Sequence, residues 1–246
     1  MEDDIKLLKE KFNKIKEMGW LNSNRTDYGV IGVTFEKLVG VTTNELEIPD
    51  FGSIEIKTKS KSKFDYISLF NCVPTGPNFH EVERIKETFG YPDSKLKIFK
   101  VFGGDVFSNK LSKIGNNFYF KLNVHKFQKK ITLSVYDMQC NKIEESTYWD
   151  FDILEEKLTR KLKYLAIIGT DKIKRDGKIY FKYKTINLYK LKSFDTFIAL
   201  VEHGFIKLTF KLSIFKDEKR FGKIHDRGTS FSIKEKDIYK LFDYIE

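Results

Sequence analysis

Two acidic residues and a lysine lie close together in one short segment of the chain. Segment Pro49–Lys57 reads Pro-Asp-Phe-Gly-Ser-Ile-Glu-Ile-Lys, so Asp50 precedes a glycine while Glu55 and Lys57 follow it. Proteins bind Mg²⁺ through one or two carboxylates, and water or phosphate oxygens fill its remaining positions. The cation can lower the pKa of a water, and a nearby lysine can position that water or neutralise charge. The segment therefore indicates metal-dependent hydrolysis of a phosphodiester.

The expected geometry of this segment is a turn followed by a strand. The proline restricts the residue before it to an extended conformation, and Phe51-Gly52 can turn because glycine tolerates unusual backbone angles. Side chains on a strand alternate between its two faces. Ile54 and Ile56 are then expected to face a core, and the polar row consists of Ser53, Glu55, Lys57 and Lys59. The two acids on either side of the turn could share one cation.

The same spacing also has a plainer explanation. The chain is 33% charged, so an acid and a lysine two residues apart are a weak signal. On a solvated strand, alternating acids and bases usually form ordinary pairs across the sheet face. Taken alone, these three side chains leave both interpretations open.

Length and charge limit the class of protein. With 246 residues, 41% hydrophobic and 15% aromatic, the chain can bury a sizeable core as one large domain or as two lobes. Its formal net charge of +10 favours a polyanionic partner, and nucleic acid is the first candidate. A generally lysine-rich proteome would produce the same charge without such a partner.

The cysteines and the start of the chain bear on location. Cys72 and Cys140 are too few and too scattered for a disulfide framework or a zinc site, which fits a reducing cytoplasm. The start Met1–Asp4 is acidic and lacks the apolar region of a secretion signal. No apolar run reaches the roughly 18 residues of a membrane span. We therefore expect a cytoplasmic protein with no membrane partner.

Hydrophobic periodicity predicts a mixed α/β fold. Apolar residues at helical spacing predict helices within 5–15, 34–39, 80–89, 151–162, 193–204 and 238–245. Alternating or short apolar runs predict a hairpin within 46–58 and strands within 66–72, 96–102, 117–126, 131–137, 164–168, 178–188, 206–214 and 229–233. Segment 216–228 is expected to be a loop.

In order along the chain, these pieces resemble the MvaI/BcnI type of restriction endonuclease, which is related to the mismatch-repair nicking enzyme MutH. The resemblance covers most of the chain and is carried by Gly29–Leu38, Pro49–Phe51, Ile54–Thr58, Leu69-Phe70, Pro74-Thr75, Pro77, Tyr148-Trp149, Phe151-Asp152, Lys161–Tyr164, His225-Asp226, Gly228-Thr229 and Phe231. This ordered set is far more specific than an acid and a lysine alone.

The resemblance implies a fold, a reaction and a metal. The fold would be that of the PD-(D/E)xK nucleases, a mixed central sheet flanked by helices, with two lobes around a DNA cleft. Within one nuclease domain covering 1–246, the catalytic lobe would lie mainly in 1–140 and the DNA-recognition lobe mainly in 145–235. The enzyme would be a Mg²⁺-dependent monomer that cuts double-stranded DNA one strand at a time. A cognate DNA methyltransferase is expected in the same cell, but not as a bound partner.

The family's catalytic positions fall on Asp50, Glu55 and Lys57, and the main-chain carbonyl of Ile56 would be a further metal ligand. Glu36 matches an additional active-site acid on a helix, where it would anchor a metal-bound water or a second cation. Without the resemblance, Glu36 is simply a solvent-facing helix residue.

The resemblance also implies base contacts from a His-Asp-x-Gly-Thr segment, which here is His225–Thr229. Arg227 could donate two hydrogen bonds to guanine, and His225 could donate or accept one. Arg227 could equally contact a phosphate, and His225 could be a structural loop residue. The expected DNA-contacting residues are His225, Asp226, Arg227, Thr229, Lys207, Thr209, Lys211, Arg220, Lys223, Lys59, Asn71, Thr75, Asn78 and His80.

Two features of the second lobe leave the target open. The polar face of segment 206–214 would line the cleft, although without the resemblance a plain solvated strand face is the commoner case. Relatives carry arginine where this chain has Lys211 and Ser232. Lysine lacks the planar fork of arginine, so the recognised bases could differ from theirs.

Three functions follow from these observations, and a type II restriction endonuclease is favoured. It would cut unmodified DNA into defined fragments. A MutH-like repair nickase would need partner proteins for efficient cleavage. A non-catalytic DNA-binding module would bind with steep salt dependence and leave the DNA intact.

Overall fold

The computed structural model describes residues 2–23, 29–41, 48–60 and 65–245. The chain forms two compact units, of which the first consists of 1–65, 157–192 and 239–246 and the second of 66–156 and 193–238. This division differs from the expected lobes, because 157–192 joins the first unit and 66–140 joins the second. The physical reason is strand pairing, since the strand that pairs with Ile54–Ser60 lies far along the chain, at Tyr164–Thr170.

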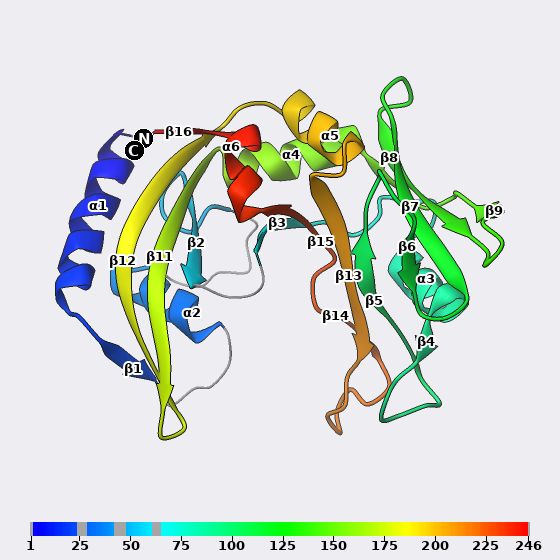
Figure 1. Cartoon of the computed structure of the whole chain (residues 1–246), viewed down its shortest axis with the longest axis horizontal. Helices are drawn as coiled ribbons and strands as arrows, with labels where there is room; N and C mark the ends of the chain where they lie inside the picture. Colours follow the sequence, from blue (N-terminus) through cyan, green and yellow to red (C-terminus); the bar gives the residue numbers. More distant parts are fainter. Residues whose placement is uncertain (1, 24–28, 42–47, 61–64, 246) are drawn as a thin grey trace. The chain divides into compact units, whose positions relative to one another are not determined.

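The first unit is built on a mixed sheet, as predicted. Its strands lie in the order β1 (Leu21–Ser23), β12 (Lys178–Leu191), β11 (Tyr164–Arg175) and β2 (Ile54–Ser60), and β16 (Phe242–Tyr244) also pairs with β12 (Figure 1). Strands β11 and β2 are parallel, and the pairs β1–β12, β11–β12 and β12–β16 are antiparallel. Among the described strands, β2 pairs only with β11, so its other edge is open.

Helices α1 (Glu2–Glu17) and α2 (Val30–Val39) cover one face of this sheet (Figure 1). Phe12 of α1 and Phe35 of α2 belong to one buried cluster with alternate strand residues, among them Ile54, Ile56, Ala166, Ile168 and Phe181. Because strand side chains alternate, the intervening residues Glu55 and Lys57 point to the opposite face. The core therefore determines which face of β2 is left for polar side chains.

The second unit contains two antiparallel sheets. One has the order β3 (Tyr66–Asn71), β15 (Ser230–Lys234), β13 (Ile206–Ile214), β5 (Lys100–Val106) and β4 (Tyr91–Pro92), with β14 (Ile224–Asp226) paired to β13. The other has β10 (Tyr148–Asp150), β8 (Lys130–Tyr136), β7 (Phe118–His125) and β6 (Ser112–Ile114), with β9 (Lys142–Glu144) paired to β8. Trp149, Phe210 and Phe231 pack together in the core of this unit.

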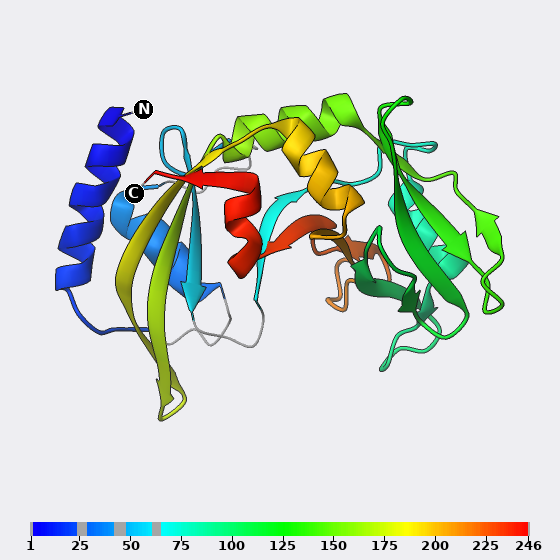
Figure 2. The same cartoon turned by 45° about the horizontal axis from the view of Figure 1, so that its top comes forward.

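The remaining helices complete the two units. Helices α3 (Glu81–Phe89) and α5 (Phe194–Glu202) and the 3₁₀ helix Glu235–Asp237 belong to the second unit, where α5 packs against β7 and β13 (Figure 2). Helix α4 (Phe151–Leu162) begins in the second unit and ends in the first. None of the described helices is long and apolar enough to cross a lipid bilayer.

Most predicted elements are confirmed, and the differences have tertiary causes. The predicted final helix is only one turn, α6 (Ile238–Leu241), because the next residues pair with β12, with Tyr244 opposite Tyr189. The strand predicted within 96–102 begins at Lys100, and β14 forms inside the segment expected to be a loop because β13 offers it a pairing edge. Part of the hairpin predicted within 46–58 lies outside the described residues.

Candidate active site and DNA-contacting residues

A two-residue turn precedes β2 and separates the acids. Phe51 and Ile54 exchange backbone hydrogen bonds of 2.9 and 2.8 Å, so the turn lies at Gly52-Ser53, one residue later than predicted. Gly52 has φ +56, and a Cβ there would come within 2.7 Å of the Asp4 carboxylate of α1. Asp4 also accepts hydrogen bonds from the backbone N–H and the hydroxyl of Ser53. Helix α1 thus holds the turn in place.

Asp50 reaches across this turn to the open edge of β2. Its Oδ2 accepts a 2.8 Å hydrogen bond from the backbone N–H of Ile56. The N–H and C=O of one strand residue point to the same side of the strand, so the Ile56 carbonyl also faces this open edge. Asp50 and the Ile56 carbonyl, both predicted metal ligands, therefore lie on the same side of β2.

Glu55 is 1% exposed although it is an acid. Its Oε1 accepts a hydrogen bond from the Nζ of Lys57, and the Nζ of Lys161 lies 3.6 Å from the same oxygen. Its Oε2 is buried and has no hydrogen-bond partner among the described residues. A buried carboxylate oxygen without a partner costs free energy, and it is the kind of oxygen that a cation would occupy.

Lys161 is a site residue that sequence reasoning did not single out. It lies near the end of α4, over a hundred residues beyond Glu55, and nothing in its local sequence connects the two. The only signal was its place in segment Lys161–Tyr164, which carried the family resemblance. The parallel pairing of β11 with β2 brings the end of α4 to Glu55.

Glu36 joins the same site from α2. A Cβ on Gly32 would lie 3.2 Å from Thr58 Oγ1 and 3.8 Å from Glu36 Oε1, so a residue without a side chain allows α2 to approach β2 closely. Burial raises the pKa of Glu36; the charge of Asp50 raises it further, whereas Lys57 and Lys161 lower it. The helix glutamate is therefore part of the acidic cluster and not a remote surface residue.

Burial also raises the pKa of Glu55, and the charge of Lys57 opposes this effect while Asp50 adds to it. Three carboxylates in a poorly solvated place repel one another unless positive charge lies between them. Within the part of the chain that the structure describes, no cluster of three or more His, Cys, Asp or Glu side chains forms a ready metal site. Mg²⁺ needs only one or two carboxylates beside water and phosphate oxygens, so Asp50, Glu55 and the Ile56 carbonyl fit it.

In the second unit, the predicted base-contacting segment forms β14 and the turn after it. The ring of His225 stacks on Phe215 at 4.0 Å, and the guanidinium of Arg220 lies over the same Phe215 ring at 3.8 Å. Arg220 also pairs with Asp217 at 2.9 Å. The predicted phosphate contact Arg220 is thus engaged within its own loop, where it helps to hold Phe215 against His225.

The other residues of this segment differ in exposure: Thr229 is buried, Asp226 is half-buried and Arg227 is exposed. Asp226 accepts hydrogen bonds from the Gly228 N–H and the Thr229 hydroxyl, and Thr229 is 1% exposed. These two predicted DNA contacts therefore shape the turn. Arg227 is exposed and lines a hollow of about 380 Å³ together with Lys211.

The polar face of β13 is similarly divided. Lys207 and Thr209 both bind the Asp105 carboxylate, at 2.5 and 2.7 Å, and Lys207 is buried. The contacts with Asp105 account for the positions of both side chains without a DNA ligand. Lys211 and, beyond the strand, Lys223 are exposed. Ser232, one of the departures from the family pattern, is buried opposite Lys207.

The predicted loop contacts lie between β3 and α3. Asn71 packs against Gly228, where an added Cβ would come within 2.9 Å of the Asn71 amide. The hydroxyl of Thr75 accepts the Asp150 N–H, and Asn78 donates to Glu81. His80 is exposed ahead of α3. Lys59 is half-buried on β2, where its carbonyl accepts a hydrogen bond from Thr170.

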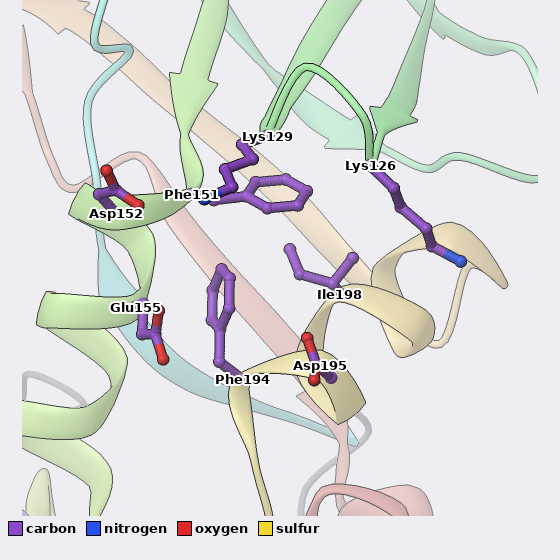
Figure 3. A pocket seen from close by; sticks show the side chains of 8 residues that line it. All are labelled: Lys126, Lys129, Phe151, Asp152, Glu155, Phe194, Asp195 and Ile198. Atoms are coloured by element: carbon purple, nitrogen blue, oxygen red, sulfur yellow. The ribbon is translucent and has the colours of Figure 1, made fainter.

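A larger cavity, of about 500 Å³, contains none of the predicted site residues. It lies where α4 and α5 begin, next to the β7–β8 turn, and Figure 3 shows its apolar rings between charged side chains. Its lining residues are Lys126, Lys129, Phe151, Asp152, Glu155, Phe194, Asp195 and Ile198. Its charges are of both signs, and it does not belong to the site around Glu55.

Comparison with known proteins identifies one family over nearly the whole chain. A model described as the MvaI/BcnI restriction endonuclease family matches residues 9–242, nearly the whole chain. The chain belongs to the MvaI/BcnI restriction endonuclease family. It is a site-specific DNA endonuclease by that membership, and the resemblance noted from its sequence is confirmed.

Solved structures of the family enzyme MvaI resemble the whole chain. The restriction endonuclease MvaI in complex with cognate DNA substrate is 30% identical, with a TM-score of 0.91, over 100% of this chain and 98% of that one. MvaI in the absence of DNA matches over the same shares with 30% identity and a TM-score of 0.64. A search of curated protein sequences found no match.

Proposed function

We propose that this member of the MvaI/BcnI family is a type II restriction endonuclease that hydrolyses double-stranded DNA at a short specific sequence with Mg²⁺. It acts as a monomer, cuts one strand at a time, and works in the cytoplasm beside a methyltransferase that protects the cell's own DNA. The observation that carries the proposal is the buried Glu55, whose Oε2 lacks a partner among the described residues, next to Lys57 and across a turn from Asp50.

Asp50, Glu55 and the Ile56 carbonyl are the residues we assign to the cation. Bound Mg²⁺ would supply a water of lowered pKa and would stabilise negative charge on the scissile phosphate. The carboxylate of Asp50 is already oriented by the Ile56 N–H, which fixes its direction before any ligand binds.

Lys57 is assigned to the attacking water. Its ammonium donates to Glu55 and is therefore held close to the acids. A fixed positive charge there orients the water and offsets charge that develops on the phosphate. Lys161 adds a second positive charge beside Glu55, and Glu36 would accept a hydrogen bond from the same water.

Base recognition is assigned to the second unit. Arg227 and Lys211, exposed in one hollow, are the candidates for base edges, and His225 is oriented by Phe215. Asp226 and Thr229 support the turn that presents Arg227. Lys59, Lys223, Asn71, Thr75, Asn78 and His80 are assigned to positioning contacts, which set register without reading sequence.

Digestion of unmethylated phage DNA with Mg²⁺ tests the proposal, with Glu55→Ala as the matched variant. We expect discrete fragments from the wild type and intact DNA from the variant, and end sequencing of the fragments would give the site. Intact DNA from a wild-type protein that still binds it would instead indicate a partner-dependent nickase or a silent DNA-binding relative. Cleavage by Glu55→Ala would refute the assigned site.

A further inference from the structure

The β11–β12 hairpin of the first unit continues past the end of the catalytic strand. Thr170 of β11 lies opposite Ser60, the last residue of β2, but β11 goes on to Arg175 before the chain turns into β12. Asp176 and Gly177 form this turn with φ +48 and +75, the pattern of a tight type I′ hairpin turn. In Figures 1 and 2 the tip extends beyond β2. It is therefore an ordered extension of the catalytic sheet.

The tip of this hairpin is exposed and strongly basic. All residues from 172 to 178 are exposed, and they read Lys-Ile-Lys-Arg-Asp-Gly-Lys. Arg175 and Lys178 are direct cross-strand partners, although like charges opposite each other weaken a sheet. Among the described residues, Lys174, Arg175 and Lys178 form no ion pair. A bound polyanion would remove the repulsion that the free hairpin leaves uncompensated.

The strand register places part of this charge on the catalytic face. Glu55 lies opposite Leu165 and Lys57 opposite Ile167, so the odd-numbered residues of β11 share the face of the catalytic side chains. Beyond β2 the alternation continues, because Lys172 pairs with Phe181, which is buried in the core on the other face. Arg175 and its partner Lys178 therefore point to the same side of the sheet as Glu55 and Lys57.

The length of the extension sets its reach along DNA. Eight residues separate Ile167, beside Lys57, from Arg175, which corresponds to at most about 26 Å at the rise of an extended strand. DNA rises about 3.4 Å per base pair, so the tip reaches at most about eight base pairs from the cut. A backbone phosphate that distance from the cut lies outside a short recognition sequence.

We infer that the β11–β12 hairpin tip, through Arg175 and Lys178, binds the phosphate backbone of DNA that flanks the cleavage site. The inference rests on the proposed function for the position of the DNA. The contact is electrostatic and independent of base sequence, because these side chains are exposed cations and lie at the tip of a strand pair. It adds affinity for long DNA without changing the site that is read.

The test compares two variants with the same loss of charge. One is Arg175→Gln, Lys178→Gln; the control is Lys6→Gln, Lys14→Gln, at exposed positions of α1, which covers the opposite face of the sheet. Binding is measured by fluorescence anisotropy across a salt series, with Ca²⁺ in place of Mg²⁺. The duplexes contain the site found by digestion, with about 20 or about four base pairs on each side.

We expect the hairpin variant to lose at least tenfold in affinity for the long duplex. Its slope of log affinity against log salt should fall by roughly two, because each lost phosphate contact removes about 0.9. The control should stay within about threefold of the wild type, and the hairpin variant should match the wild type on the short duplex. Equal loss on both duplexes, or equal behaviour of variant and control, would overturn the inference.

The nuclease function and the hairpin contact can be refuted independently of each other. If the wild type cuts DNA but the hairpin variant binds the long duplex like the control, the nuclease function stands and the hairpin contact is refuted. If the wild type never cuts, the same series on a duplex of arbitrary sequence still decides the hairpin contact, because the proposed contact reads no bases. Circular dichroism of both variants establishes that neither has lost the fold.

Discussion

A single side chain, Glu55, links the stability of the fold to its chemistry. Burying an ionised carboxylate costs free energy unless hydrogen bonds or opposite charges compensate it. Lys57 and Lys161 compensate Oε1, whereas Oε2 has no partner among the described residues. A divalent cation would complete this compensation. Metal binding and thermal stability should therefore be coupled through this one residue.

The first prediction concerns this coupling. Mg²⁺ should raise the midpoint of thermal unfolding of the wild type relative to EDTA, but not that of Glu55→Gln. At a cation concentration of about 100 times Kd, the expected stabilisation is about 2.7 kcal/mol. Differential scanning fluorimetry measures the shift, and Glu83→Gln on α3 serves as a control with the same chemical change at an exposed site. An undiminished shift in Glu55→Gln would mean that the cation binds elsewhere.

At the scale of elements, a polar network joins β7, β8 and the segment between β9 and β10. Glu145 accepts hydrogen bonds from Asn123 at 2.9 Å and Thr132 at 2.6 Å, and it lies 3.1 Å from His125 and 2.6 Å from Lys142. Burial alone would raise the pKa of Glu145, but the hydrogen bonds from these four residues outweigh it and hold the pKa at about 2. The ionised carboxylate therefore stabilises the folded sheet.

The second prediction follows from the sign of this shift. A folded pKa below the unfolded value of about 4.3 gives stability that is present above that value and is lost as pH falls toward 2. Glu145→Gln should therefore lower the free energy of unfolding by about 1–3 kcal/mol at neutral pH, and the difference should vanish toward pH 2. Urea titrations in a Trp20→Phe background report on the second unit, because Trp149 is then the only tryptophan. A difference that persists at about pH 2 would contradict the assignment.

A helix or strand is predictable from the sequence when the residues that determine it are neighbours along the chain. Helices α2 and α5 carry local end signals in the sequence, Gly40 after the first and Ser193 before the second. The structure confirms both signals, because Gly40 is left-handed and Ser193 accepts the Thr196 N–H. Strand β13 was predicted because its apolar residues alternate. The sequence pattern does not show β14 and β16, because each is short and is held by pairing, β14 with the preceding strand β13 and β16 with the distant strand β12.

At the scale of the whole molecule, the chain passes repeatedly between its two units. It changes unit at 65/66, 156/157, 192/193 and 238/239. The catalytic strand β2 belongs to the first segment, but its strand partner β11 belongs to the third. Neither unit is therefore a continuous piece of sequence, and the folding of each depends on segments that are far apart in the chain.

The third prediction is that the fragment 1–140, which the expected lobe boundary would isolate, does not fold. It contains β2 without β11 and β12, and β3 and β5 without β13 and β15, so strand edges and core faces would be left uncovered. Far-UV circular dichroism and urea unfolding should show no cooperative transition, whereas the full chain should show one or more. A cooperative unfolding transition of the fragment would mean that α1, α2 and β2 form a core by themselves.

The sequence by itself determined the short-range chemistry of this protein: the acid, turn and acid-x-lysine of Pro49–Lys57, the amphipathic helices and alternating strands, and the family to which they point. These features depend on residues that are neighbours along the chain, so their spacing carries the information. Only the tertiary structure decided that Lys161 lies beside Glu55, that Thr229 and Lys207 are buried, and that β11 extends the catalytic face to Arg175. Each of these depends on strand pairing or burial between distant segments, and no local pattern encodes that register.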